Sequence, residues 1–378
     1  MAMEAPPEEV YLFVGGTRPE AVKLSPVILA MRARGRRAVL VATGQHRLLF
    51  HQTLAEFGLA ADVDLDVAAG TPGALLARLV PLLGEVMAEA KPVAVVVQGD
   101  TTSALAGALA GGYAQVPVVH VEAGLRTGRM DPFPEEMHRK LIGQVAALHL
   151  APTAAAARAL AAEGVAAADV VMTGNSGIDA LLWMASRVQG QAVPPVLGRV
   201  DWRRPVVLAT VHRRESHGGP LLEILAALEA LAEEAEILLP VHPHPAVAGP
   251  VRARLAGVGG VHLLPPLDYA DFVWLMGRAS CAVTDSGGVQ EEAPALGLPV
   301  LVLRRETERR EGLVSGHARL VGTDCGAIVA AVREVLLGRM RLAEPALPYG
   351  QGDAAGLMAD AMLARFGTVS AVRRQALA

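Results

Sequence analysis

Three carboxylates in the first half of the chain stand where ligand-binding residues of α/β proteins are usually found. Asp100 comes shortly after the apolar run 93–97, and Glu122 directly follows the run 118–121. Glu135 opens a helical segment after the loop 126–134. Asp100 alone is typical of a helix N-cap, and Glu135 alone is typical of a first-turn carboxylate. Repetition of this placement argues against three independent caps and favours carboxylates that act on a ligand at the carboxyl ends of the strands.

A first candidate anion site follows the first apolar run. The segment 15–23 reads GGTRPEAVK and passes from a predicted strand into a predicted helix. A helix N-terminus favours an anion, and Arg18 can pair with a phosphate, with Lys23 about one turn further on. The alternative is a structural turn with a surface Arg and Lys. The pattern is not GxGxxG, so a dinucleotide-binding interpretation loses its main support.

Two further candidate anion sites lie in the second half. His212 and the arginines beside it follow the run 205–209, where they suit a pyrophosphate, although a solvated charged loop is the alternative. Ser286, Gly287 and Gly288 stand between a strand and a helix, a pattern typical of a phosphate cradle. Glu292 lies one turn into that helix, where it can accept ribose hydroxyls.

Nothing in the chain has the spacing of a metal site. His242 and His244 have no carboxylate or Cys beside them at ligand spacing, so we interpret them as loop histidines. Cys281 and Cys325 are most simply two core thiols. We therefore expect no metal and no other cofactor.

Length and composition limit the class of protein. A chain of 378 residues with 52% hydrophobic residues predicts two domains with large cores. Net charge −4 and the absence of a basic block argue against a nucleic-acid partner. The sequence shows no membrane span and no signal peptide, so the expected localisation is cytoplasmic.

Short apolar runs alternate with helical stretches in both halves, which predicts βαβ units and parallel sheets. The expected fold class is α/β, with two Rossmann-like domains facing each other across a cleft. The hinge is placed in the segment 174–204, which contains the Pro194–Pro195 pair. The predicted strands are 10–14, 38–42, 93–97, 118–121, 148–151, 205–209, 237–241, 261–264, 281–284 and 300–303.

Six ordered segments together resemble a known family. GTRPEAVK, QGDTTSALA, HVEAGLRTG, FPEEMHR, HRRES and TDSGGVQEEAPALGLPVLVLR are similar to the signature blocks of bacterial non-hydrolysing UDP-N-acetylglucosamine 2-epimerases. The resemblance runs from about Val10 to the last helix. It implies a GT-B-like fold with an N-terminal domain of residues 1–176 joined by the C-terminal helix 353–378, and a UDP-binding domain of residues 177–352.

The resemblance also implies residue roles. The residues expected at the UDP phosphates or nearby groups are Arg18, His212, Ser286, Gly287, Gly288 and Arg309. Glu292 is expected at the ribose and Phe272 at the uracil, while Lys23, Asp100, Glu122 and Glu135 surround the sugar. His212 and Lys23 join the three carboxylates as catalytic candidates. The resemblance further implies a homodimer and a second UDP-N-acetylglucosamine as activator, at Gln45, His46, Arg78 and His242.

This chain departs from the family pattern in four places. The loop 128–135 is one residue shorter, His138 replaces a frequent Asn, Leu267 replaces a residue that is polar in some members, and the segment 304–310 lacks a usual Pro. These departures bear on sugar preference and regulation, not on the class of enzyme.

The implied reaction is reversible epimerisation at C2 of UDP-N-acetylglucosamine to UDP-N-acetylmannosamine. It passes through UDP and 2-acetamidoglucal, and sequence does not decide which carboxylate is acid and which is base. Alternatives remain: a UDP-sugar glycosyltransferase, a hydrolysing epimerase, a non-catalytic UDP-sugar sensor and an epimerase of another UDP-sugar. The carboxylate set argues against a sensor.

Overall fold

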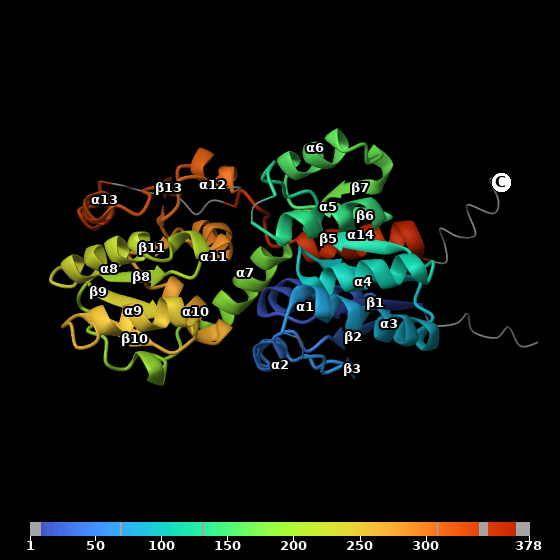
Figure 1. The fold of residues 1–378 in the computed structure, drawn as a ribbon, viewed down its shortest axis with the longest axis horizontal. Helices are drawn as coiled ribbons and strands as arrows, with labels where there is room; N and C mark the ends of the chain where they lie inside the picture. The colour runs from blue at the N-terminus through green and yellow to red at the C-terminus, as the bar shows by residue number, and fades with distance from the viewer. Residues whose placement is uncertain (1–8, 69, 131, 308, 340–346, 368–378) are drawn as a thin grey trace, which may run out of the picture. The chain divides into compact units, whose positions relative to one another are not determined.

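The computed structural model describes residues 9–68, 70–130, 132–307, 309–339 and 347–367 (Figure 1). It divides the chain into two compact units. Unit 1 contains the residues up to Ala180 and those from Tyr349 onward, and unit 2 contains Leu181–Pro348. The first passage between the units falls within α7 (Ser176–Val188), close to the predicted boundary after residue 176.

Unit 1 is built on a parallel sheet of seven strands in the order β3-β2-β1-β4-β5-β6-β7. The central strands are buried on both faces, which explains why they are continuous apolar runs: Val95, Val96 and Val97 have no exposed surface. The strands are β1 (Val10–Gly15), β2 (Arg37–Ala42), β3 (Val63–Asp64), β4 (Ala94–Gln98), β5 (Val118–Val121), β6 (Leu148–Ala151) and β7 (Val170–Met172).

The helices of unit 1 cover the sheet with apolar stripes. In α3 the buried residues Leu75, Leu79, Leu83 and Met87 recur at helical spacing and face the core. The helices are α1 (Arg18–Ala33), α2 (Arg47–Glu56), α3 (Pro72–Ala90), α4 (Thr102–Tyr113), α5 (Glu135–Val145), α6 (Ala154–Ala162), the 3₁₀ turn η1 (Ala167–Asp169) and α14 (Ala354–Phe366).

The last helix belongs to unit 1, and Figure 1 shows α14 among the elements of that unit. It packs on α1 and buries Met358 and Met362 completely. The Asp179 carboxylate in α7 accepts a hydrogen bond from the amide of Ala355 at 2.8 Å, which satisfies a free donor in the first turn of α14. Two distant segments of the chain therefore share one core.

Unit 2 repeats the architecture with a parallel sheet of six strands in the order β10-β9-β8-β11-β12-β13. The strands are β8 (Val206–Thr210), β9 (Glu236–Pro240), β10 (Val261–Leu264), β11 (Cys281–Thr284), β12 (Val300–Val302) and β13 (Ala318–Leu320). The helical segments are η2 (Pro195–Leu197), η3 (Arg214–Ser216), α8 (Gly219–Leu231), α9 (Pro245–Leu255), α10 (Tyr269–Met276), α11 (Gly287–Glu292), η4 (Ala293–Leu296), α12 (Arg310–Val314) and α13 (Cys325–Leu336).

The predicted fold class, α/β with two Rossmann-like domains and parallel sheets, is confirmed. In the described part of the chain, none of the helices has the length and apolar character that a membrane crossing requires.

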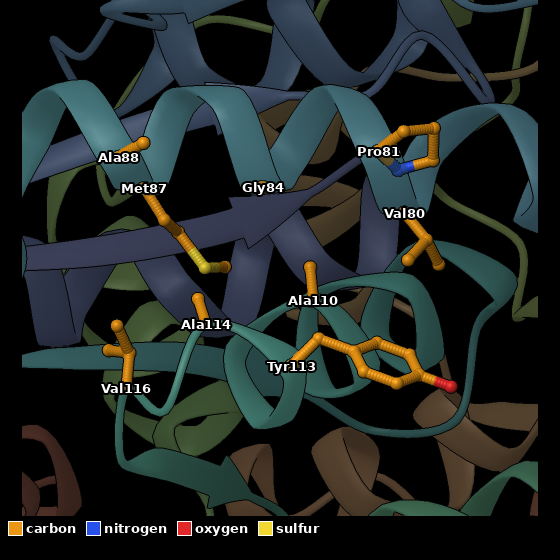
Figure 2. Close-up of a pocket in the computed structure, with 9 residues that line it drawn as sticks. All are labelled: Val80, Pro81, Gly84, Met87, Ala88, Ala110, Tyr113, Ala114 and Val116. Carbon is orange, nitrogen blue, oxygen red and sulfur yellow. The ribbon is translucent and has the colours of Figure 1, made fainter.

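A hollow of about 500 Å³ lies between α3 and the end of α4 in unit 1 (Figure 2). Its lining includes Met87, Tyr113 and Val116. Val116 precedes β5, so the hollow lies toward the amino ends of the strands. The carboxylates considered above are at the opposite ends.

Candidate functional site

Glu122 is engaged by two side chains at the carboxyl edge of the unit 1 sheet. Lys23 Nζ, from the second turn of α1, lies 2.5 Å from Glu122 Oε1. Gln98, the last residue of β4, donates its Nε2–H to Glu122 Oε2. Only 11% of the Lys23 side chain and 7% of the Glu122 side chain are exposed. Lys23 and Glu122, both expected around the sugar, thus form an ion pair. Gln98 is a further partner of Glu122 that the sequence did not identify.

The backbone at Glu122 has an unusual conformation. Its φ is +63°, in the left-handed region that residues other than glycine rarely adopt. Such strain persists only where surrounding contacts hold it, and it occurs often at functional sites. The Lys23 and Gln98 contacts hold the side chain, and the amide of Ala123 donates to the Leu150 carbonyl at 3.1 Å.

Asp100 is bound by α5 rather than by its own helix. Arg139 Nε and Nη2 reach Asp100 Oδ2 at 2.8 and 2.7 Å. His138 Nδ1–H donates to the Asp100 carbonyl at 2.8 Å, which fixes the proton of that ring on Nδ1. The N-cap of α4 is Thr101, whose hydroxyl accepts from the Ala104 amide. The capping alternative for Asp100 is therefore wrong.

The two glutamates that open α5 have different surroundings. Glu136 has no exposed surface, and its carboxylate binds Arg139 Nη1 at 2.9 Å and the Thr127 amide at 3.3 Å. Glu135 Oε2 is buried and has no hydrogen-bond partner among the described residues. Glu136 thus connects Arg139 with the loop that contains Thr127. One carboxylate oxygen of Glu135 remains available to a ligand.

The N-terminus of α1 is occupied by a residue of the chain itself. Glu20 Oε2 accepts from the amides of Gly16 and Thr17 at 3.0 and 2.8 Å and from the Thr17 hydroxyl at 2.8 Å. The expectation that these amides hold a ligand anion needs correction, because the anion is Glu20. Arg18 remains half-buried on the same turn. The Thr17-x-x-Glu20 spacing of a capping box was the available signal.

Burial raises the pKa of Glu20 to about 7. The hydrogen bonds from Thr101, Thr17 and Gly16 act in the opposite direction, because they stabilise the ionised form. Desolvation is the larger effect, since no cation is among these partners.

The residues expected at an activator site occupy three places. Gln45 and His46 lie in the loop after β2, beside the turn after β1: Gln45 Oε1 accepts from the Ser103 hydroxyl at 2.8 Å, and the His46 amide donates to the Gly16 carbonyl at 2.7 Å. Arg78 lies on α3 and donates to the Ala68 carbonyl at 2.5 Å. His242 follows β9 in unit 2.

Asp285 organises the loop after β8 in unit 2. It has no exposed surface, and it accepts from the amides of His212 and Arg213 at 3.0 and 2.9 Å and from the Ser216 hydroxyl at 2.8 Å. Asp285 Oδ1 lies 3.2 Å from His212 Nδ1, which favours the tautomer that leaves Nε2 for a ligand. The sequence analysis gave Asp285 no role. It also did not identify that Asp285, in the TDSGG segment, binds the HRRES segment.

His212 stacks on a second ring. Its centroid lies 5.9 Å from that of His242, with 26° between the planes. Burial lowers the pKa of His212, and Asp285 opposes that effect. Among the described residues, no group of three or more His, Cys, Asp or Glu side chains is arranged to hold a metal ion.

The Ser-Gly-Gly segment opens α11, as expected, with Ser286 at the N-cap. A Cβ on Gly287 would lie 2.7 Å from the guanidinium carbon of Arg309, so a side chain there would displace that guanidinium. Arg309 is largely buried and pairs with Glu291 Oε1 at 2.8 Å. The expected phosphate ligands Gly287 and Arg309 are thus packed against each other.

The residues expected at the nucleoside also lie in unit 2. Glu292 is the last residue of α11, and its Oε1 accepts from the Tyr269 hydroxyl at 3.3 Å. Tyr269 begins α10, and Phe272 lies on the same helix, partly exposed.

Comparison with known proteins places the chain in a family. The family model described as UDP-N-acetylglucosamine 2-epimerase matches residues 29–363. A probable UDP-N-acetylglucosamine 2-epimerase of Ralstonia nicotianae is 42% identical, over 94% of this chain and 99% of that protein. The UDP-N-acetylglucosamine 2-epimerase of Escherichia coli K12 is 40% identical, over 93% of this chain and 97% of that protein.

Solved structures agree with the sequence comparisons. The crystal structure of the Neisseria meningitidis UDP-GlcNAc 2-epimerase bound to UDP-GlcNAc matches with a TM-score of 0.89 and 34% identity. The match covers 94% of this chain and 99% of that one. The resemblance found in the signature segments is confirmed: the chain belongs to the UDP-N-acetylglucosamine 2-epimerase family.

Proposed function

We propose that this protein interconverts UDP-N-acetylglucosamine and UDP-N-acetylmannosamine without net hydrolysis. Its family membership and the activity named for its relatives support the substrate and the reaction class. The observation that carries the proposal is the set of carboxylates at the carboxyl edge of the unit 1 sheet and on α5. Of these, Asp100 and Glu135 supply acid and base groups that a binding module does not need, and Glu122 holds Lys23 beside them.

The reaction requires that C2 lose a proton although no carbonyl activates it. Departure of UDP solves this, because the C1–O bond breaks with its electron pair going to the β-phosphate and positive charge develops at C1. A carboxylate takes the C2 proton, and the C–H electron pair forms the C1=C2 bond of 2-acetamidoglucal. Return of a proton to the opposite face of C2 and of UDP to C1 gives the epimer.

The contacts within unit 1 suggest how the carboxylates divide the work. Lys23 engages one oxygen of Glu122 and Gln98 engages the other. Glu122 therefore serves mainly to hold the Lys23 ammonium group in place near the sugar. Asp100 is oriented by Arg139, and Glu135 keeps an unpartnered oxygen. We assign the proton movements at C2 to Asp100 and Glu135, which exchange roles as acid and base when the direction of reaction reverses.

Unit 2 supplies the leaving-group site in this proposal. Asp285 orients His212, and Ser286 is the N-cap of α11, whose first amides can donate to an anion. Preorganised donors of this kind stabilise negative charge as it develops on the departing phosphate. Arg18 and Arg309 are the candidate cations for the pyrophosphate.

The activator and the assembly remain predictions from family resemblance. A second UDP-N-acetylglucosamine is expected at Gln45, His46, Arg78 and His242, and the expected assembly is a homodimer.

The deciding experiment incubates the purified protein with UDP-N-acetylglucosamine in D₂O and follows proton and phosphorus NMR. We expect UDP-N-acetylmannosamine, deuterium at C2 of both epimers, and no accumulation of free UDP. Accumulation of UDP with free sugar would identify a hydrolysing enzyme. No change, even at high substrate concentration, would refute the assignment for this substrate.

A further inference from the structure

Glu20 joins two loops that carry different parts of the proposed site. Its Oε2 accepts three hydrogen bonds from Gly16 and Thr17, on the turn after β1. Its Oε1 accepts from the Thr101 hydroxyl at 2.6 Å, on the loop after β4. The first turn continues into Arg18, and the second loop contains Asp100 next to Thr101. One buried carboxylate therefore connects the turn that carries Arg18, a candidate phosphate-binding residue, with the loop that carries Asp100, a candidate acid or base.

The turn after β1 is also held from its other side. A Cβ on Gly16 would lie 1.9 Å from the Thr43 hydroxyl and 2.7 Å from the Ser103 hydroxyl, so no side chain fits. Those two hydroxyls are hydrogen-bonded to each other at 2.7 Å. The Gly16 carbonyl accepts from the His46 amide. The turn is enclosed between this hydroxyl pair and Glu20, and it has little freedom to move independently of α4.

A simple helix cap accounts for only part of this arrangement. A capping carboxylate at the third position of α1 needs only the amides of its own first turn. The bond to Thr101 adds a residue 81 positions away, on an element that makes its own cap through the Ala104 amide. The extra bond contributes nothing to the α1 cap, but it fixes the distance between the two loops.

We propose that Glu20 is a positioning residue that holds the Arg18 turn and the Asp100 loop in the relative placement needed for turnover. This inference rests on the proposed epimerase function, because that function gives Arg18 and Asp100 their roles. Glu20 has no exposed surface, and both its oxygens are engaged by protein groups, so it acts through those groups. Misplacement of a reacting group by about 1 Å can cost roughly a hundredfold in rate.

The test compares two threonines that cap helices in unit 1. Thr101 caps α4 and binds Glu20, whereas Thr71 caps α3 through the Ala74 amide and has no bond to Glu20. Thr101→Val and Thr71→Val each remove one cap hydroxyl, so the loss of a helix cap is common to the two variants. We measure kcat and KM for epimerisation, UDP affinity by calorimetry, and Tm.

We expect Thr101→Val to lower kcat by roughly tenfold or more, with Tm and UDP affinity close to those of Thr71→Val. Equal kcat values for the two variants would overturn the proposal. Glu20→Ala should lose turnover in the same way, and Glu20→Gln should recover most of it. The amide oxygen of Gln still accepts from Gly16 and Thr17, and its NH₂ can donate to the Thr101 hydroxyl. Similar losses in Glu20→Gln and Glu20→Ala would count against positioning through these hydrogen bonds.

Hydrogen exchange gives a measurement that does not depend on activity. In Thr101→Val we expect faster amide exchange in peptides covering residues 15–18 as well as 99–104, and in Thr71→Val only near residue 74. Faster exchange confined to residues 99–104 would contradict the coupling. If the wild-type enzyme does not epimerise the substrate, the proposed function fails, while this exchange result still decides whether Glu20 couples the loops.

Discussion

Carboxylates of unit 1 differ in the groups that balance their charge. Glu122 has an ammonium group at 2.5 Å, and Asp100 has a guanidinium at 2.7 Å. Glu20 has only neutral donors around it, so burial raises its pKa to about 7. A buried carboxylate without a cation takes up a proton much more readily than one that has a cation beside it.

Stability should therefore depend on pH through Glu20. Its pKa rises from 4.5 in the unfolded chain to about 7 in the folded protein, so the folded state binds the proton more tightly. The contribution to stability is full below pH 4.5 and is lost as pH rises through 7. Between pH 4.5 and 8 we expect wild type to lose roughly 3 kcal/mol relative to Glu20→Gln.

Chemical denaturation across that pH range measures this difference. The control is Glu89→Gln, which removes an exposed carboxylate of α3 and should follow wild type at every pH. A pH-independent difference between wild type and Glu20→Gln would mean that Glu20 titrates at its ordinary value.

Catalysis and UDP binding should separate at Asp100, a proposed acid/base group, and at Glu122, which fixes Lys23. Asp100→Asn and Glu122→Gln are expected to lower kcat by roughly 10² to 10⁴-fold, because each removes a charged group beside the sugar. UDP affinity should change by less than about threefold, because most of the expected UDP contacts are in unit 2. Kinetics and calorimetry on the same preparations test this.

Glu163→Gln is a suitable comparison for these two variants. Glu163 is an exposed carboxylate of unit 1 that pairs with Arg126 at 2.7 Å. Its removal should leave turnover nearly unchanged. Losses of UDP affinity in Asp100→Asn or Glu122→Gln that match the losses in kcat would argue that the two carboxylates shape binding rather than chemistry.

At the scale of elements, α11 is positioned by close packing against Arg309. The Arg309 guanidinium lies against the backbone of Gly287, and Glu291 of the same helix holds it by an ion pair. Helix and arginine therefore move as one body, and a substitution at their contact should affect both.

We predict that Gly287→Ala weakens UDP binding at least tenfold, because the new Cβ would lie only 2.7 Å from the Arg309 guanidinium carbon and would displace it. Stability should fall by roughly 1–3 kcal/mol. The control is Gly249→Ala in α9, where a Cβ meets no atom within 4 Å and helix propensity improves. Calorimetry with UDP and thermal unfolding measure both effects. Undiminished UDP affinity in Gly287→Ala would show that Arg309 does not contribute to the site.

Elements were predictable where burial is complete. The predicted strands 118–121, 148–151 and 281–284 coincide with β5, β6 and β11, because buried parallel strands are apolar runs bounded by turns. The predicted strand 261–264 also coincides with β10, although three of its four residues are only partly buried. The short edge strands β3, β7 and β13 and the helix α2 were not predicted. β3 pairs through only two residues, both at least partly exposed, which leaves little pattern to detect.

Within the site, sequence identified residue types but not their contacts. Asp100 and Glu122 were predicted from their positions after strands. Arg139 and Asp285 were missed as partners, because they act on residues 39 and 73 positions away. Spacing along the chain indicates helix faces and strand ends, whereas such long-range pairs are set by the order of strands in the sheet.

At the scale of the whole molecule, unit 1 depends on a segment that follows unit 2 in the chain. Met358 and Met362 of α14 are fully buried, and α14 packs on α1. Each buried methionine contributes about 2–5 kcal/mol by comparison with alanine. Unit 2 is continuous and has its own core around Leu228 and Ile237.

Truncation after residue 352 should consequently affect the units unequally. We expect unit 1 to lose most of its stability, and unit 2 to keep its protected amides. Amide hydrogen exchange in β5 reports on unit 1, and exchange in β8 reports on unit 2. The double variant Met358→Ala, Met362→Ala is a milder test and should also destabilise β5 before β8. Equal loss of protection in both strands would show that the units unfold as one.

The return of α14 to unit 1 has a consequence during synthesis on the ribosome. The first 180 residues emerge earliest, yet the face of α1 that α14 covers stays open to water until the last helix leaves the exit tunnel. The continuous unit 2 is complete before then, so it is expected to reach its native state while unit 1 is still unfinished. For this nascent chain, the order of folding reverses the order of translation, and unit 1 is the part with the longer need for chaperones.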